Sequence, residues 1–141
     1  MSTSQKRART VPTQRTGDES PRILVVDDDE AIRNLLLEAL SAEGYDVRAV
    51  ADGFEALAEL RRWCPDIVVT DLLLPKLHGW DLTAACLAQR GRRPKLVAMS
   101  AAGPLALRLA REAGADEALA KPFALQDVLD AVQSLAQPRA A

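Results

Sequence analysis

The sequence predicts an α/β protein with a doubly wound, five-stranded parallel sheet and the strand order 2-1-3-4-5. Short apolar runs alternate with amphipathic segments along the chain, as in repeated βαβ units. The runs at 22–27, 66–70 and 95–100 are apolar almost throughout, which is typical of strands buried on both faces. The runs at 45–50 and 117–121 alternate or are short, so we expect them at the two edges. The strand order 2-1-3-4-5, which doubly wound sheets use, places these two runs at the edges and the other three inside.

Helices are predicted from apolar residues repeated at helical spacing. The first carries five such residues on one face: Ile32, Leu35, Leu36, Ala39 and Leu40. Gly44 ends this helix. The other helices are predicted at 53–62, 79 to about 89, 104–113 and about 124–136.

Length and composition indicate a single domain. The chain has 141 residues, and no apolar run approaches the ~18 residues of a membrane span. We expect a disordered basic and polar leader at 1–20, a folded domain at 21–138 and a short tail at 139–141. The four basic charges of the leader stand without aromatic residues, so nucleic acid is an unlikely partner, and we expect no membrane contact. Cys64 and Cys86 form no metal-binding motif, which favours the reducing cytoplasm.

Polar side chains stand at the carboxyl ends of four predicted strands. The first strand ends in Asp27, and Asp28 follows it. The third ends in Asp71, the fourth in Ser100 and the fifth in Lys121. These ends meet at one edge of a parallel sheet, where such folds bind ligands. Three crowded carboxylates repel one another, and a hard divalent cation such as Mg²⁺ would relieve that repulsion. The hydroxyl and ammonium groups suit the oxygens of a phosphoryl group, for which Asp71 is a candidate nucleophile.

Four stretches, in this order, carry a resemblance to a known family: ILVVDDDEAIR, DIVVTDLLLP, VAMSA and AKPF. Together they resemble the response-regulator receiver domain of two-component signalling, over about 21–138. The resemblance implies the flavodoxin-like receiver fold. The single-domain, stand-alone type is the expectation, with a piece of a longer regulator as the alternative.

The resemblance also implies a role for each site residue. Asp27 and Asp28 are similar to the acidic pair that organises Mg²⁺, with the backbone carbonyl of Leu73 as a further ligand. Asp71 resembles the phospho-acceptor, Ser100 the switch hydroxyl and Lys121 the phosphate-pairing lysine. In the family, the bond before the proline that matches Pro122 is usually cis. In the family, two side chains flank the path by which a water reaches the phosphoryl group during hydrolysis, and their positions match Leu73 and Ala102.

One position departs from the family pattern. Three residues before the lysine, receivers usually carry an aromatic residue that moves inward with the hydroxyl, but this chain has Ala118. The fourth helix places Leu107 off the arc of Leu105, Ala106, Leu109 and Ala113. We therefore expect Leu107 to lie exposed near Ala118; partial cover by a neighbouring helix is the alternative.

The resemblance implies a Mg²⁺-dependent switch that accepts a phosphoryl group on Asp71 from a sensor histidine kinase or phosphotransfer protein. Phosphorylation would change binding of an unidentified downstream protein through the fourth helix, fifth strand and fifth helix. Such a protein catalyses only its own phosphorylation and dephosphorylation. Two alternatives stay open: a phosphorylation-independent interaction module, and a phosphatase with an aspartate nucleophile. Among the residues, Ser100 could also serve as a helix cap, and Asp29 and Glu30 fit a helix N-terminus.

Overall fold

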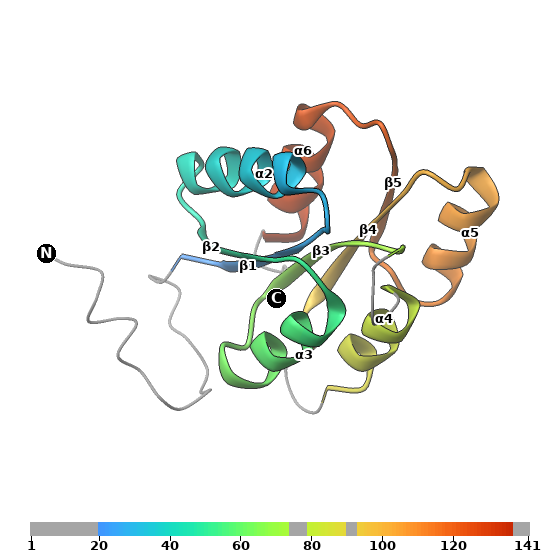
Figure 1. Ribbon diagram of the computed structural model, residues 1–141, viewed down its shortest axis with the longest axis horizontal. Coiled ribbons are helices and arrows are strands. Elements are labelled where there is room, and N and C mark those ends of the chain that lie inside the picture. Colours follow the sequence, from blue (N-terminus) through green and yellow to red (C-terminus); the bar gives the residue numbers. More distant parts are fainter. Residues whose placement is uncertain (1–19, 74–78, 90–92, 137–141) are drawn as a thin grey trace, which may run out of the picture.

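A computed structural model describes residues 20–73, 79–89 and 93–136 and contains one five-stranded sheet (Figure 1). Its strands are β1 (Arg22–Val26), β2 (Asp46–Val50), β3 (Ile67–Asp71), β4 (Lys95–Ser100) and β5 (Glu117–Ala120). All pairings are parallel, in the order β2-β1-β3-β4-β5. The predicted fold class and strand order are therefore confirmed. The predicted leader at 1–20 lies, apart from Ser20, outside the described residues, as do residues 137–138 of the predicted domain and the whole tail at 139–141.

Helices cover both faces of this sheet. They are α2 (Glu30–Ala42), α3 (Gly53–Arg62), α4 (Gly79–Leu87), α5 (Pro104–Glu112) and α6 (Leu125–Ala136). Helices α2 and α6 lie on one face, and α3, α4 and α5 lie on the other (Figure 1). Across the described ranges, none of the helices has both the length and the apolar character needed to cross a bilayer.

The sheet has an apolar core on each side, which explains the unbroken apolar runs of its central strands. Along β1, Ile23 and Val25 pack towards α2 and α6, whereas Leu24 and Val26 pack towards the other three helices. Every residue of the edge strand β2 is partly exposed, in agreement with the alternation of its sequence. The parallel central strands thus bring their carboxyl ends together at one edge of the sheet.

Helix α5 is oriented differently from the prediction. Leu105 and Leu109, which were predicted to face the core, are 58% and 46% exposed. Ala110 is buried, and Leu107 packs against the same core cluster as Ala118. The expectation that Leu107 lies exposed was therefore wrong, because α5 turns Leu107 and the small Ala110 towards the sheet. On α2, Leu35 is likewise exposed, although it was predicted on the apolar face.

Candidate functional site

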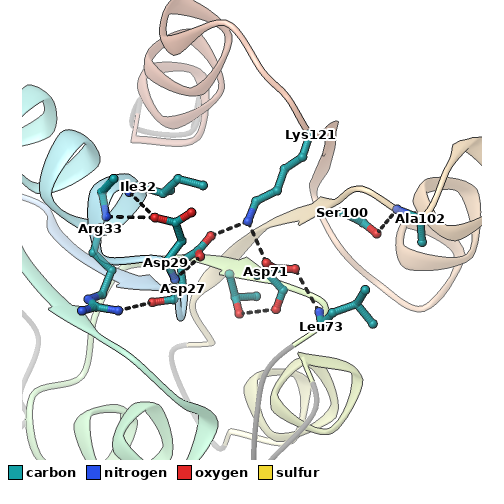
Figure 2. A network of polar contacts seen from close by, with 11 residues as sticks. Asp27, Asp29, Ile32, Arg33, Asp71, Leu73, Ser100, Ala102 and Lys121 are labelled. Atoms are coloured by element: carbon teal, nitrogen blue, oxygen red, sulfur yellow. Dashed lines mark hydrogen bonds and ion pairs between the residues drawn. The ribbon is translucent and has the colours of Figure 1, made fainter.

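The strand ends bring the predicted polar residues to one edge of the sheet. The register pairs Val26 with Thr70 across β1 and β3, so the residues that follow them, Asp27 and Asp71, stand side by side. Ser100 pairs with Ala120, which places Lys121 directly beyond the end of β5. Figure 2 shows Lys121 reaching back over the strand ends towards both carboxylates.

Three carboxylates form a cluster that can hold a metal ion. Asp27, Asp28 and Asp71 each offer one oxygen, and these oxygens lie within 4.8 Å of one another. Asp27 and Asp71 are buried, whereas Asp28 is exposed to solvent. A set of carboxylate oxygens with an open side fits a hard cation that keeps some of its waters, as Mg²⁺ does.

Lys121 supplies a positive charge to this cluster. Its Nζ lies 2.7 Å from Oδ2 of Asp27 and 2.7 Å from Oδ2 of Asp71, and its side chain is only 15% exposed. Burial disfavours the ammonium ion, but hydrogen bonds and charge attraction from the two aspartates outweigh it and raise the pKa of Lys121 above 10.5. The charge of Asp71 at the end of a buried strand is therefore compensated by Lys121, in addition to any metal ion.

The two buried aspartates are held in place by short local hydrogen bonds. Oδ1 of Asp27 accepts from the Asp29 N–H at 2.9 Å, and Oδ1 of Asp71 accepts from the Leu73 N–H at 2.9 Å. Asp29 in turn accepts from Ala31 N–H and thereby caps α2, as the sequence allowed. The bond from Leu73 places its backbone beside Asp71; its carbonyl as a metal ligand stays a prediction.

Burial disfavours the ionised form of the Asp27 carboxyl group. Desolvation raises its pKa above 3.8, although the hydrogen bonds from Lys121 and the Asp29 N–H act in the opposite direction. A carboxyl group whose pKa is raised on folding stabilises the folded state most when it is protonated. The stability that the protonated Asp27 contributes is therefore lost as the pH rises from about 3.8 through the higher pKa of the folded state.

We accordingly expect Asp27→Asn to be more stable than the wild type at pH 7 in the absence of divalent metal. The amide avoids the cost of a buried charge, while Lys121 keeps Asp71 as its partner. Urea unfolding in a chelator should show a higher midpoint for the variant, with a smaller gain for the matched Asp28→Asn because Asp28 is exposed. A midpoint at or below the wild-type value would contradict the argument from burial.

Ser100 is buried and bonds to its own turn. Its Oγ accepts a hydrogen bond from the Ala102 N–H at 3.0 Å, while its carbonyl accepts from the Lys121 N–H at 2.9 Å. This hydroxyl does not cap α5, whose N-cap is Gly103. Ser100 thus lies at the site edge, but its side chain is directed to the loop before α5 (Figure 2).

Arg33 also contacts the site, although its sequence position alone predicted no role for it. Its Nη1 donates to the carbonyl oxygen of Asp27 at 2.8 Å. The available signal was its position, one helical turn after the capping Asp29. The Lys121–Pro122 bond is cis, as predicted from the resemblance. Ala118 is buried on β5.

Comparisons with known proteins agree on one family. The profile described as "Response regulator receiver domain" matches residues 23–133. A curated relative, the response regulator MprA of Mycobacterium leprae (strain TN), is 40% identical over 115 residues, which are 81% of this chain and 50% of that protein. The chain thus spans about half the length of the curated relatives it matches.

Solved structures also resemble this fold. The signal receiver domain of a response regulator from Bermanella marisrubri is 33% identical with a TM-score of 0.77, covering 84% of this chain and 100% of that one. The chemotaxis response regulator CheY4 of Vibrio cholerae is 27% identical with a TM-score of 0.74, covering 82% and 98% of the two chains.

Proposed function

Because the chain belongs to the response regulator receiver domain family, we propose that it is a phosphorylation-activated signalling switch in which Asp71 accepts the phosphoryl group. The observation that carries the proposal is the position of Asp71. On one side lie Asp27 and Asp28, two carboxylates that can share a metal ion with it, and on the other lies the ammonium group of Lys121. An aspartate that only formed a turn would need neither a metal-binding cluster nor a lysine beside it. This arrangement can bring a carboxylate nucleophile and an anionic phosphoryl group together.

Asp27, Asp28, Asp71 and the carbonyl of Leu73 would hold Mg²⁺, which supplies charge neutralisation to the oxygens of the transferring phosphoryl group. An oxygen of Asp71 attacks the phosphorus of a phosphohistidine and a P–O bond forms. The P–N bond breaks, and its nitrogen takes the electron pair and a proton from solvent water, so that neutral imidazole leaves. Lys121, which forms ion pairs with Asp27 and Asp71 in the unphosphorylated structure, then pairs with an oxygen of the new phosphoryl group. Ser100 offers its hydroxyl to another oxygen after leaving the Ala102 N–H.

The phosphoryl donor would be a sensor histidine kinase or a phosphotransfer protein, and the protein would catalyse only its own phosphorylation and dephosphorylation. The output surface would be formed by α5, β5 and α6, and the exposed Leu105 and Leu109 support an apolar contact there. We place the protein in the cytoplasm, in keeping with the free thiols of Cys64 and Cys86.

Incubation with Mg²⁺ and a small acyl phosphate tests the proposal. We expect one acid-stable, base-labile phosphoryl group per chain, none in Asp71→Asn, and an unchanged amount in the matched Asp81→Asn, which alters an exposed aspartate of α4. Multiple turnover of a phosphomonoester would instead identify a phosphatase. Absence of any adduct in the wild type would favour a phosphorylation-independent interaction module.

A further inference from the structure

We propose that Arg33 is a positioning residue that sets how tightly the acidic cluster binds its metal ion. The inference rests on the proposed function, in which Asp27 and Asp28 hold Mg²⁺. Arg33 lies in the first turns of α2, and its guanidinium reaches back to the end of β1, where Nη1 donates to the carbonyl oxygen of Asp27 at 2.8 Å (Figure 2). A hydrogen bond from an ionised donor is stronger than one between neutral groups.

The carbonyl that Arg33 holds belongs to the peptide group between Asp27 and Asp28. A peptide group is planar, so fixing its oxygen also fixes the nitrogen of Asp28 and the direction in which the chain leaves the strand. The preceding peptide group is held by the sheet edge, since the Asp27 N–H donates to the Val50 carbonyl at 3.2 Å. Arg33 therefore continues the restraint of the sheet by one residue, to the start of Asp28.

Asp28 is the ligand that depends most on this restraint. Asp27 is held through both of its carboxylate oxygens, by Lys121 and by the Asp29 N–H. The Asp28 carboxylate is exposed and accepts no hydrogen bond from the residues that the structure describes. Among the described residues, the contact that restrains Asp28 acts on its backbone, through the peptide group that Arg33 holds. A looser backbone must be ordered when a metal ion binds, which lowers affinity.

The charge of Arg33 would act in the opposite direction to its hydrogen bond. A positive charge near the cluster repels a cation, so removal of the charge alone would tighten metal binding. Removal of the restraint on the Asp27–Asp28 peptide group would weaken it. The sign of the change in Mg²⁺ affinity therefore distinguishes a positioning residue from a bystander charge.

Titration calorimetry with Mg²⁺ on the wild type, Arg33→Met and the matched Arg61→Met tests the inference. Arg61 is exposed on α3, near the end of the helix away from the site. We expect Arg33→Met to bind Mg²⁺ about fivefold more weakly, below the roughly 10–100-fold effect of partners that contact ligand atoms directly. Arg61→Met should match the wild type. At saturating Mg²⁺, adduct formation from acyl phosphate should recover in Arg33→Met to within about twofold of the wild type.

Thermal melting without metal checks that the variants are folded; if Arg33→Met is not, Arg33→Gln, whose side chain is shorter, replaces it with the same expectation. Equal or tighter Mg²⁺ binding in the variant would overturn the inference. A loss of rate that saturating Mg²⁺ does not restore would also overturn it, because the damage would then extend beyond metal affinity. If the wild type itself binds no Mg²⁺, the proposed function fails as well, and the two failures are thus distinguishable.

Discussion

Replacing Lys121 with methionine should destabilise the metal-free protein by about 3 kcal/mol, the order expected when one partner of a buried ion pair is removed. Methionine keeps most of the apolar stem but removes the ammonium that lies 2.7 Å from both Asp27 and Asp71. Two buried carboxylates would then face each other without compensation. One of them can take up a proton to relieve the repulsion, so we do not expect the upper end of the known range.

Urea unfolding at pH 7 in a chelator measures this effect, with Lys95→Met as the control. Lys95 begins β4 at the opposite end of the same sheet. Addition of Mg²⁺ should stabilise Lys121→Met more than the wild type, since the cation then supplies the missing charge. Equal unfolding midpoints for the two lysine variants would show that the pairing with Asp27 and Asp71 contributes little.

The difference in stability between the wild type and Lys121→Met should depend on pH in one direction. The pKa of Lys121 is raised on folding, so its contribution is fully present below about 10.5 and is lost as the pH rises through the higher pKa of the folded state. The wild-type advantage over Lys121→Met should therefore persist through neutral and mildly alkaline pH. A fall in that advantage between pH 7 and 9 would contradict the assignment of the stabilising charge to Lys121.

Most of the fold could be predicted because its signals are local and repeat along the chain. β1 and β3 are apolar on both faces, and only interior strands of a doubly wound sheet need that composition. The orientation of α5 could not be predicted in the same way. A prediction from hydrophobicity places the leucines of this helix on the buried face, because leucine is more apolar than alanine. Close packing on the sheet instead favours the small Ala110 against the strands and leaves Leu105 and Leu109 exposed to solvent.

The candidate site was predictable as a set of residues but not as a network. Parallel strands must bring Asp27, Asp71 and Lys121 to one edge, whatever the side chains do. Sequence alone could not show that Lys121 contacts both acids at once, or that Asp28 stays exposed beside them. The position of Arg33, one helical turn after the capping Asp29, does not identify the backbone carbonyl to which it donates, because every residue carries such an acceptor.

Replacing Leu73 with glutamine should speed loss of the phosphoryl group from Asp71 by about tenfold, less than the roughly 10²–10⁴-fold effect of a true general base. Hydrolysis requires a water in line with the phosphorus on the side opposite Asp71. Leu73 follows two residues after Asp71, is 54% exposed, and its backbone N–H is bonded to that aspartate. Its apolar side chain at this solvent-facing edge can neither donate to nor accept from a water, whereas an amide can do both.

Decay of the labelled protein, followed with Mg²⁺ present and the donor removed, measures the lifetime. Leu73→Ala is the informative companion, since it removes the bulk of leucine without adding a hydrogen-bonding group. If orientation of the water dominates, Leu73→Ala decays like the wild type and only Leu73→Gln is faster. If leucine acts by crowding the water out, both variants decay faster. Equal lifetimes for all three proteins would show that the side chain at this position does not control access, and that the lifetime is set by groups elsewhere.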